Sequence, residues 1–359
     1  NLDHTGPGDG NSMPLDFTVT ATNSVGETAS NTFTVTINDD VPDAANVTAT
    51  MEENTATLIS LVEGDGATVE AGEAYISGAD DATVTLGTPT FSNLPAGVVP
   101  GTPDIALVQT ATGYDVSITP GTAFDALAEG ESMLMEIPFT VEDSDGDTVT
   151  KVIVVTVTGT NDQPVITSGA QTGSVEETAD VVGGADPDPA AATGIISFLD
   201  VDLSDDPEAS HDGGTVSNMA FAHGYTPTDE QIAALKAGFS LDDAALSNFS
   251  NGTGSTGWTY QVVNAVVDFL GAGDSVELTY VVTIDDGKGG IVTQNVVVTV
   301  TGTSDAPTVT VADNFVVNEE DLTNGNSGAL TFAGDVGLNF NDYSSVGLSA
   351  RLKTSGAIP

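Results

Sequence analysis

Acidic side chains recur along this chain in three kinds of cluster. The first is a pair of glutamates: Glu52 and Glu53, Glu176 and Glu177, and Glu319 and Glu320. The second is a short Asp- or Asn-rich segment before a proline: Asp39 and Asp40, Asn161 and Asp162, and Asp305. The third lies in glycine-bearing turns: Asp143, Asp145 and Asp147, and Asp285 and Asp286. Carboxylate, amide and main-chain oxygens are the ligands of Ca²⁺, which takes about six to eight of them. We therefore interpret these clusters as candidate calcium ligands.

A further acidic segment follows an apolar run at 195–199. Asp200 and Asp202 alternate there, so both carboxylates are expected on one face of a strand end, and Asp205 follows closely. Acidic residues are also good turn formers, which is the plain alternative for any one of them. The recurrence of all three clusters together favours metal binding. An EF-hand is not expected at Asp143, because its twelfth position falls on Val154 within a strand.

The balance of charge limits the possible partners. The chain has 53 acidic residues against five Lys and Arg, a formal net charge of −48. Such a surface excludes nucleic acid, whose phosphates require cations, and disfavours anionic membranes. The charge also weakens a compact state unless salt or bound cations screen it. No apolar run reaches membrane-spanning length, and the first residues carry no secretory signal pattern, so direct membrane insertion is not expected.

The chain contains no cysteine. An extracellular protein without disulfides needs other means of stabilisation, and bound metal is the simplest candidate. The abundance of Val and Thr is typical of strands rather than of disorder.

Polar and apolar residues alternate in the segments that must position the acidic clusters. Residues 148–158 and 291–301 predict two long strands, and each is preceded by another strand, at 135–141 and 276–284. The acidic turns 142–147 and 285–290 connect them as hairpins. Shorter strands are expected at 46–51, 81–85, 106–110, 114–118, 164–168, 195–199, 258–263, 307–311 and 329–332. This pattern predicts an all-β fold of antiparallel Greek-key sandwiches.

One short helix is expected near 227–238. The segment has Pro227 near its start, early acidic residues, Lys236 in the last turn and Gly238 at its end. Ile232 and Leu235 fall at helical spacing. We expect this helix to pack over one end of a sandwich rather than to bind a ligand.

A repeated motif that ends on a proline divides the chain. It ends at Pro42, Pro164 and Pro307, each time after a Thr- and Val-rich strand and an acidic linker. Repetition at this length indicates tandem domains. We expect the end of a repeat at 1–41, complete repeats at 42–163 and 164–306, and the beginning of another at 307–359. The short, proline-containing linkers predict stiff joints.

Several segments resemble known repeats. The run from Trp258 through Leu278-Thr-Tyr-Val-Val-Thr-Ile-Asp-Asp-Gly to Val298-Thr-Val-Thr-Gly-Thr-Ser-Asp-Ala-Pro resembles the VCBS repeat, and Phe198-Leu-Asp-Val-Asp-Leu looks like its opening. The unit at 42–163, with Phe124-Asp-Ala-Leu-Ala-Glu-Gly-Glu and Val141-Glu-Asp-Ser-Asp-Gly-Asp, is similar to cadherin-like repeats of type I secreted, RTX-type bacterial adhesins. The resemblance implies tandem Ig- or cadherin-like sandwiches with Ca²⁺ at the joints. It also implies type I secretion, an extracellular location on the bacterial cell surface, and a role in attachment or biofilm.

The first partial repeat departs from this pattern. Its turn reads Thr22-Asn-Ser-Val-Gly where the complete repeats carry acids, so we expect no metal in that turn.

Sequence patterns that are typical of enzymes lack here the neighbouring elements or partner residues that they require. Gly252-Thr-Gly-Ser-Thr-Gly has the spacing of a dinucleotide-binding loop, but a strand rather than a helix follows it, so we interpret it as a glycine loop. His4, His211 and His223 are scattered, and there is no activated Ser or Cys pattern. The prediction is that the segment is not an enzyme.

Three functions remain open at this point. The preferred one is a calcium-stiffened extender of a large surface adhesin, whose first partners are the neighbouring repeats of its own chain. The second is a module for a surface glycan or protein ligand, because the repeat 164–306 is the longer one and includes the expected helix and the loop at 205–215. The third is a spacer that flanks a secreted enzyme.

Overall fold

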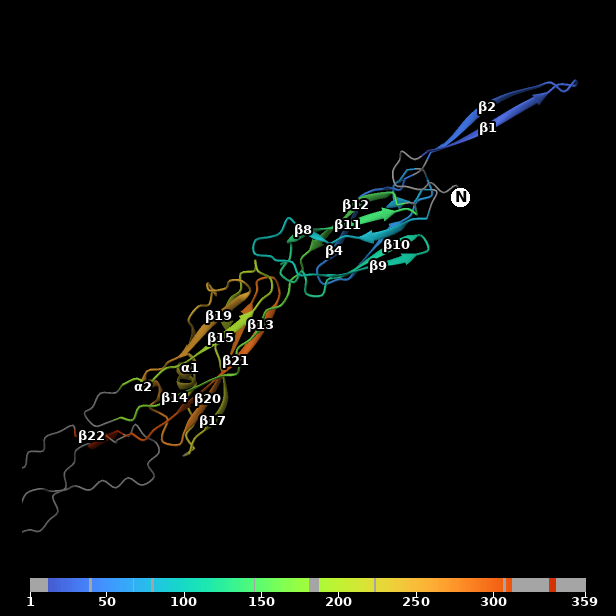
Figure 1. Cartoon of the computed structure of the whole chain (residues 1–359). Helices are drawn as coiled ribbons and strands as arrows, with labels where there is room; N and C mark the ends of the chain where they lie inside the picture. The colour runs from blue at the N-terminus through green and yellow to red at the C-terminus, as the bar shows by residue number, and fades with distance from the viewer. Residues whose placement is uncertain are drawn as a thin grey trace, which may run out of the picture. The chain divides into compact units, whose positions relative to one another are not determined.

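The computed structural model describes residues 12–38, 41–66, 68–78, 81–144, 146–180, 187–222, 224–305, 308–311 and 336–339. The chain divides into two compact units: the first comprises residues up to Asp162 together with Val201–Asp205, and the second comprises Gln163–Asp200 and the residues from Asp206 on. Both units are built from β-sheets with few helical residues (Figure 1). The predicted all-β fold of tandem sandwiches with a short helix is confirmed; the exact limits of the repeats stay a prediction.

The first unit packs two sheets together. One sheet has the strand order β4 (Val47–Glu52), β12 (Thr148–Thr158), β11 (Ser132–Glu142) and β7 (Thr83–Leu86), with β8 (Thr90–Ser92) also paired to β11. The other has the order β5 (Thr57–Val62), β10 (Gly113–Thr119) and β9 (Asp104–Thr110). A short pair, β3 (Asp43–Ala44) and β6 (Tyr75–Ile76), completes the unit.

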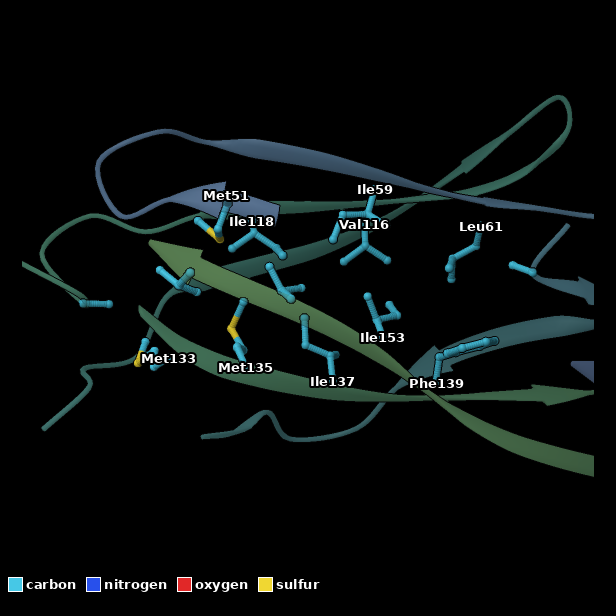
Figure 2. Packing of buried hydrophobic residues seen from close by; sticks show 14 of the residues in the cluster. Met51, Ile59, Leu61, Val116, Ile118, Met133, Met135, Ile137, Phe139 and Ile153 are labelled. Atoms are coloured by element: carbon cyan, nitrogen blue, oxygen red, sulfur yellow. The ribbon is translucent and has the colours of Figure 1, made fainter. Parts of the chain in front are cut away.

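The core of this unit follows from the period of two in its strands. Met135, Ile137 and Phe139 alternate along β11 and are fully buried. They face Ile59 and Val116 from the opposite sheet (Figure 2). Hydrophobic burial of these alternating residues therefore holds the two sheets face to face.

The second unit repeats the architecture with additions. One sheet has the order β14 (Gln171–Glu176), β21 (Ile291–Thr301), β20 (Ser275–Asp285) and β16 (Glu208–His211), with β17 (Thr215–Ala220) also paired to β20. The other has the order β13 (Val165–Ile166), β15 (Ala192–Leu199), β19 (Thr253–Tyr260) and β18 (Phe239–Leu241).

Trp258 organises the core of this unit. Its ring is buried, and its Nε1 donates to Gln171 Oε1 at 2.8 Å. Gly194 lies so close that a Cβ there would meet the indole at 2.5 Å. The glycine is therefore required by the close approach of β15 to this ring.

Helix α1 (Asp229–Lys236) begins with a capping box in which Thr228 and Gln231 bond reciprocally. Leu235 is fully buried, and the carbonyls of Leu235 and Lys236 accept from the hydroxyls of Tyr260 and Tyr280 at 2.9 and 3.1 Å. The helix is thus tied to the core, as expected. A second short helix, α2 (Asn264–Val267), was not predicted.

Two details differ from the sequence predictions. The sandwiches are not wholly antiparallel, because β4 pairs with β12, and β14 with β21, in parallel. In each pair, nearly the whole unit lies between the two strands in the sequence, and this provides the long connection that parallel pairing requires. The presumed glycine loop is also largely wrong: only Gly252 lies in a turn, whereas Gly254 and Gly257 lie in strand β19. Gly254 faces the ring of Phe198, which leaves no room for a Cβ.

Strands β1 (Ser12–Thr22) and β2 (Thr28–Asn38) form a hairpin of the same dimensions as β11–β12 and β20–β21. Among the described strands they pair only with each other. Phe17 and Phe33 stack at 5.4 Å and are about half exposed, at 47% and 53%. In register, they match the buried Ile137 and Ile153 of the first unit.

Strands β22 (Thr308–Val311) and β23 (Val336–Asn339) form a separate pair. Within the described residues, no helix has the length and apolar character needed to cross a bilayer.

Candidate metal centres

The described part of the chain buries ten carboxylates. They are Glu53, Asp143, Asp147, Glu177, Asp200, Asp202, Asp205, Asp274, Asp286 and Asp305. None of the buried side chains in that part is Lys or Arg. Buried carboxylates are costly unless they are paired, hydrogen-bonded or bound to a metal. Each of these ten carboxylates must therefore be stabilised in one of these three ways.

Glu53 lies in the first unit, directly after β4. Its Oε1 accepts from the main-chain N–H and the Oγ1 of Thr160 at 2.6 and 2.8 Å. Its Oε2 is buried and makes no hydrogen bond. Burial raises the pKa of Glu53 against the lowering effect of the Thr160 bonds, and the nearby carboxylates of Asp162 and Asp125 raise it further. A cation beside Oε2 would offset both the cost of burying the charge and the repulsion from Asp162 and Asp125.

Glu177 occupies the matching position in the second unit, directly after β14. Its Oε2 accepts from the N–H and the Oγ1 of Thr303 at 2.7 and 3.4 Å, and its buried Oε1 makes no hydrogen bond. Burial raises the pKa of Glu177 to about 8, against the bond from the Thr303 N–H, with further increases from Asp305 and Asp268. The same arrangement therefore occurs in both units.

The parallel strand pairs create this equivalence. The N–H of Glu53 donates to Thr158 O at 3.0 Å, and the N–H of Glu177 donates to Thr301 O at 2.9 Å. Each glutamate thus extends the pairing of its strand with the last strand of the unit. The side chain then reaches Thr160 or Thr303, in the repeated motif that ends each unit, next to the acidic linker.

The other glutamate of each pair lies elsewhere. Glu52 and Glu176 are exposed, because neighbouring residues of a strand point to opposite faces. The structure thus brings only one member of each pair to the linker acids.

Asp125 and Asp268 were missed by the sequence analysis, although both raise the pKa of the buried glutamate of their unit. Asp125 stands between the buried Phe124 and Leu127, and Asp268 follows the buried Val267. The signal that could have found them is an acid at the same distance before each closing hairpin. Asp274, also missed, is satisfied by the N–H groups of Ala222 and Gly271 at 2.7 and 3.1 Å.

The linker acids lie beside these glutamates. Asn161 and Asp162 are half-buried, and burial raises the pKa of Asp162, with a further increase from Asp125. In the second unit, Asp305 is buried and its Oδ1 accepts from the N–H of Asp180 at 2.8 Å.

The acidic turns use one carboxylate oxygen for structure. Asp143 Oδ1 accepts from the N–H groups of Gly146 and Asp147 at 3.0 and 2.7 Å. Asp147, at the end of the same turn, has a buried Oδ2 without a hydrogen bond. In the second unit, Asp286 Oδ1 accepts from the main-chain N–H groups of Lys288 and Gly290 at 2.7 and 3.0 Å.

Three buried aspartates form one group among the described residues. Carboxylate oxygens of Asp200, Asp205 and Asp286 lie within 4.8 Å of one another. Asp200 follows β15, Asp205 and the buried Asp202 belong to the same connection, and Asp286 comes from the β20–β21 turn. Asp285 is only half-buried. Three carboxylates at this spacing repel one another strongly unless a cation lies between them.

Five predicted ligands fall outside the described residues: Asp39, Asp40, Asp145, Glu319 and Glu320. His211 is exposed, its ring packs edge-on against Phe239 at 5.1 Å, and its Nδ1 accepts from Gly213 N–H.

The residues present fit Ca²⁺ by chemistry. The donors are hard oxygens, they are numerous, and three of them (Glu53 Oε2, Glu177 Oε1 and Asp147 Oδ2) are buried without a hydrogen bond. No thiolate is available for softer metals.

The hairpin β1–β2 supplies a natural control for the aspartate turns. Asn23 occupies the position of Asp286, and its Oδ1 accepts from the N–H groups of Val25 and Glu27 at 3.0 and 2.9 Å. An amide therefore closes the same turn without charge. We expect Asp286→Asn to keep or raise the melting temperature in chelator, because it keeps the turn and removes one of three repelling charges, and to weaken calcium binding by about ten-fold, roughly 1.4 kcal/mol.

Isothermal titration with calcium measures this effect, and Asp285→Asn is the matched control. The control changes the same charge at the neighbouring, half-buried residue, which lies outside the three-aspartate group. Equal affinity losses in both variants would contradict the assignment of Asp286.

No family model and no curated protein matches the sequence. Among solved structures, EC1-3 of mouse clustered PcdhgC3 matches with a TM-score of 0.32 and 14% identity, over 81% of this chain and 77% of that one. EC1-2 of human mucin-like protocadherin matches with a TM-score of 0.36 and 13% identity, over 73% and 98%. The protocadherin gammaB7 EC3-6 cis-dimer structure gives 0.38 and 13%, over 86% and 60%. At these scores the likeness adds nothing to the argument from the sheets and the buried acids.

Proposed function

We propose that this chain is a calcium-binding extender segment of a large secreted bacterial surface adhesin. Each sandwich would fold around calcium ions at its ends, and the repeats would serve as structural units between the cell and its attachment target. The chain's own residues would supply the ligands, and the ions would supply the positive charge that its few Lys and Arg do not.

One observation carries the proposal: the same buried glutamate arrangement recurs in two sandwiches. Glu53 with Thr160, and Glu177 with Thr303, each leave one buried oxygen without a hydrogen bond beside further acids. A single buried acid could be an accident of packing. Its repetition at matched positions indicates a selected feature, and a hard divalent cation is the partner that fits.

We assign the ligands in three groups. The first consists of Glu53, Asp125 and Asp162, the second of Glu177, Asp268 and Asp305, and the third of Asp200, Asp205 and Asp286. Asp143 and Asp147 form a fourth candidate in the first unit. The remaining predicted ligands stay predictions.

The bacterial surface, type I secretion and biofilm parts of the proposal rest on resemblance. The segment 258–307 resembles the VCBS repeat, and 124–164 resembles cadherin-like repeats of secreted adhesins. The partial repeats proposed at 1–41 and 307–359 belong to the same interpretation. The exposed aromatic face of β1–β2 supports it, since the matching face is buried in both complete sandwiches.

Thermal melting with calcium and with chelator tests the proposal. Extracellular calcium sites bind at about 10⁻⁴–10⁻³ M. At ten times the dissociation constant, each site adds about 1.4 kcal/mol to the free energy of unfolding. We therefore expect a clear rise in melting temperature with calcium and a much smaller one with magnesium, which gives up its bound water reluctantly. An unchanged melting temperature in calcium would remove the proposal.

A further inference from the structure

We propose that the outer face of the sheet β13–β15–β19 in the second sandwich binds a neutral oligosaccharide. A hollow of about 370 Å³ lies on this face. Side chains of Thr167, Ser197, Leu199, Asn248, Thr253 and Ser255 line it. We call this hollow the trough. Its three strands lie side by side in Figure 1.

The floor of the trough consists of two cross-strand pairs. Ser197 lies opposite Ser255, and Leu199 lies opposite Thr253, in the antiparallel register of β15 and β19. Residues two apart on a strand share a face, so the four side chains stand together on the outer surface. The floor thus carries three hydroxyl groups and one aliphatic side chain.

The two rims are fixed to this floor by hydrogen bonds. On one side, the N–H of Thr167 donates to Ser197 O at 2.8 Å. On the other, Asn248 Nδ2 donates to Ser255 O at 2.7 Å, and Ser255 N–H donates to Asn248 Oδ1 at 3.1 Å. The trough is therefore preformed, which lowers the entropic cost of binding a ligand there.

The lining selects an uncharged ligand. None of the eight lining residues is charged, in a chain whose net charge is −48. An anionic ligand would be repelled by the protein as a whole. A cationic ligand would find better partners in a separate hollow of about 280 Å³ that contains Asp206, Glu208 and Asp285. The trough is thus suited to a neutral molecule.

The chemistry of the lining matches a sugar. The hydroxyls of Thr167, Ser197 and Ser255 can exchange hydrogen bonds with sugar hydroxyls. The Asn248 amide is bonded to Ser255 and holds the rim in place. Leu199 is 46% exposed, and Val165, its partner on β13, is 61% exposed. These aliphatic groups offer a surface for the C–H faces of a pyranose ring. Both kinds of contact are thus present within one small surface.

An added peptide strand fits the trough less well. At the trough, the β15 edge is already used: β13 pairs with Phe198 and Leu199, and the N–H groups of Thr167 and Ser168 both donate to Ser197 O. Strand addition needs free main-chain groups at a sheet edge. The available donors and acceptors of the trough are side chains, which favours the oligosaccharide.

The test is an NMR titration of the full chain in calcium with short glucan, galactan and mannan oligosaccharides. We expect at least one of them to produce saturable amide shifts at Ser197, Asn248 and Ser255. A polyuronate oligosaccharide and a lysine-rich peptide serve as charged comparisons. Absence of saturable shifts with all three neutral sugars, or shifts at the trough with the peptide or the polyuronate alone, overturns the proposal.

Two variants distinguish the trough from the rest of the sheet. Ser197→Asp places a charge on its floor and should weaken sugar binding at least ten-fold. Thr193→Asp makes the same change on the same face of β15 outside the lining, and should change affinity less than two-fold. Leu199→Ser, which removes only the aliphatic contact of an exposed residue, should also reduce affinity and covers the case that Ser197→Asp unfolds. Equal losses for Thr193→Asp and the trough variants overturn the proposal.

Discussion

Replacing Glu177 by glutamine is expected to stabilise the protein in chelator and to destabilise it relative to the parent chain in calcium. Glutamine keeps an oxygen acceptor for the Thr303 N–H, which the glutamate receives at 2.7 Å. It removes a carboxylate that burial and the nearby Asp305 and Asp268 disfavour. Without metal the variant therefore loses an unfavourable charge, and with metal it loses a ligand.

The size of this reversal follows from the burial of the group. Removing a buried, uncompensated charge changes the free energy of unfolding by a few kcal/mol. Each kcal/mol corresponds to roughly 2–4 °C in melting temperature for a domain of this size. We thus expect a gain of several degrees in chelator and a calcium-induced rise much smaller than that of the parent chain, both measured by calorimetry at pH 8.

The neighbouring glutamate provides the control. Glu176→Gln changes the same charge one residue earlier, on the exposed face of β14. It should leave both melting temperatures within about a degree, since exposed charges contribute little to stability. Glu53→Gln and Glu52→Gln repeat the comparison in the first unit. If Glu177→Gln shows the full calcium response of the parent chain, Glu177 is not a ligand.

The stabilisation by calcium is expected to grow as pH rises from about 5 to 8. Burial raises the pKa of Glu177 from its ordinary 4.5 to about 8, and it raises the pKa values of Glu53 and Asp162 as well. Between these values the folded, metal-free protein holds protons that the unfolded chain releases. The stability that protonated Glu177 contributes is full below pH 4.5 and is lost as pH rises through about 8, and Glu53 and Asp162 act in the same direction.

Calcium reverses the effect because it binds the ionised form. At pH 5 the ion must displace the proton of Glu177, whereas near pH 8 about half of the Glu177 carboxylates are already ionised. The difference in melting temperature between calcium and chelator should therefore increase by several degrees over this range. Proton release on calcium binding, measured by titration in buffers of different ionisation enthalpy, should be largest at the acidic end. A calcium effect that is constant with pH would show that these groups are not coupled to the ion.

Local patterns were sufficient for the strands of the closing hairpins. Thr148–Thr158 and Ile291–Thr301 were predicted with the bounds that the structure has, because their alternating residues face a core on one side and solvent on the other. Turn chemistry was equally clear, since Asp143 and Asp286 close their turns through their own carboxylates. The period of α1 and its capping residues also predicted a helix at that place.

Strands whose composition departs from the usual preferences were harder to predict. Strand β19 begins at Thr253, within a glycine-rich run that we interpreted as a loop. Gly254 is accommodated there because it faces the ring of Phe198 on the paired strand β15. That reason depends on a contact between segments far apart in the chain, which no local pattern contains.

The amino-acid sequence by itself determined the excess of negative charge, the alternation of the strands and the recurrence of the acids, since composition and period are local properties. Only the tertiary structure decided which acids come together. It separated Glu176 from Glu177 by the two faces of one strand, and it brought Asp125 and Asp268 close enough to their glutamates to raise those pKa values. It also brought the side chains of the trough together from strands β15 and β19, from the residue that follows β13 and from the connection between β18 and β19. The physical reason is that strand pairing and sheet packing join residues of large sequence separation, and these contacts set burial and electrostatic coupling.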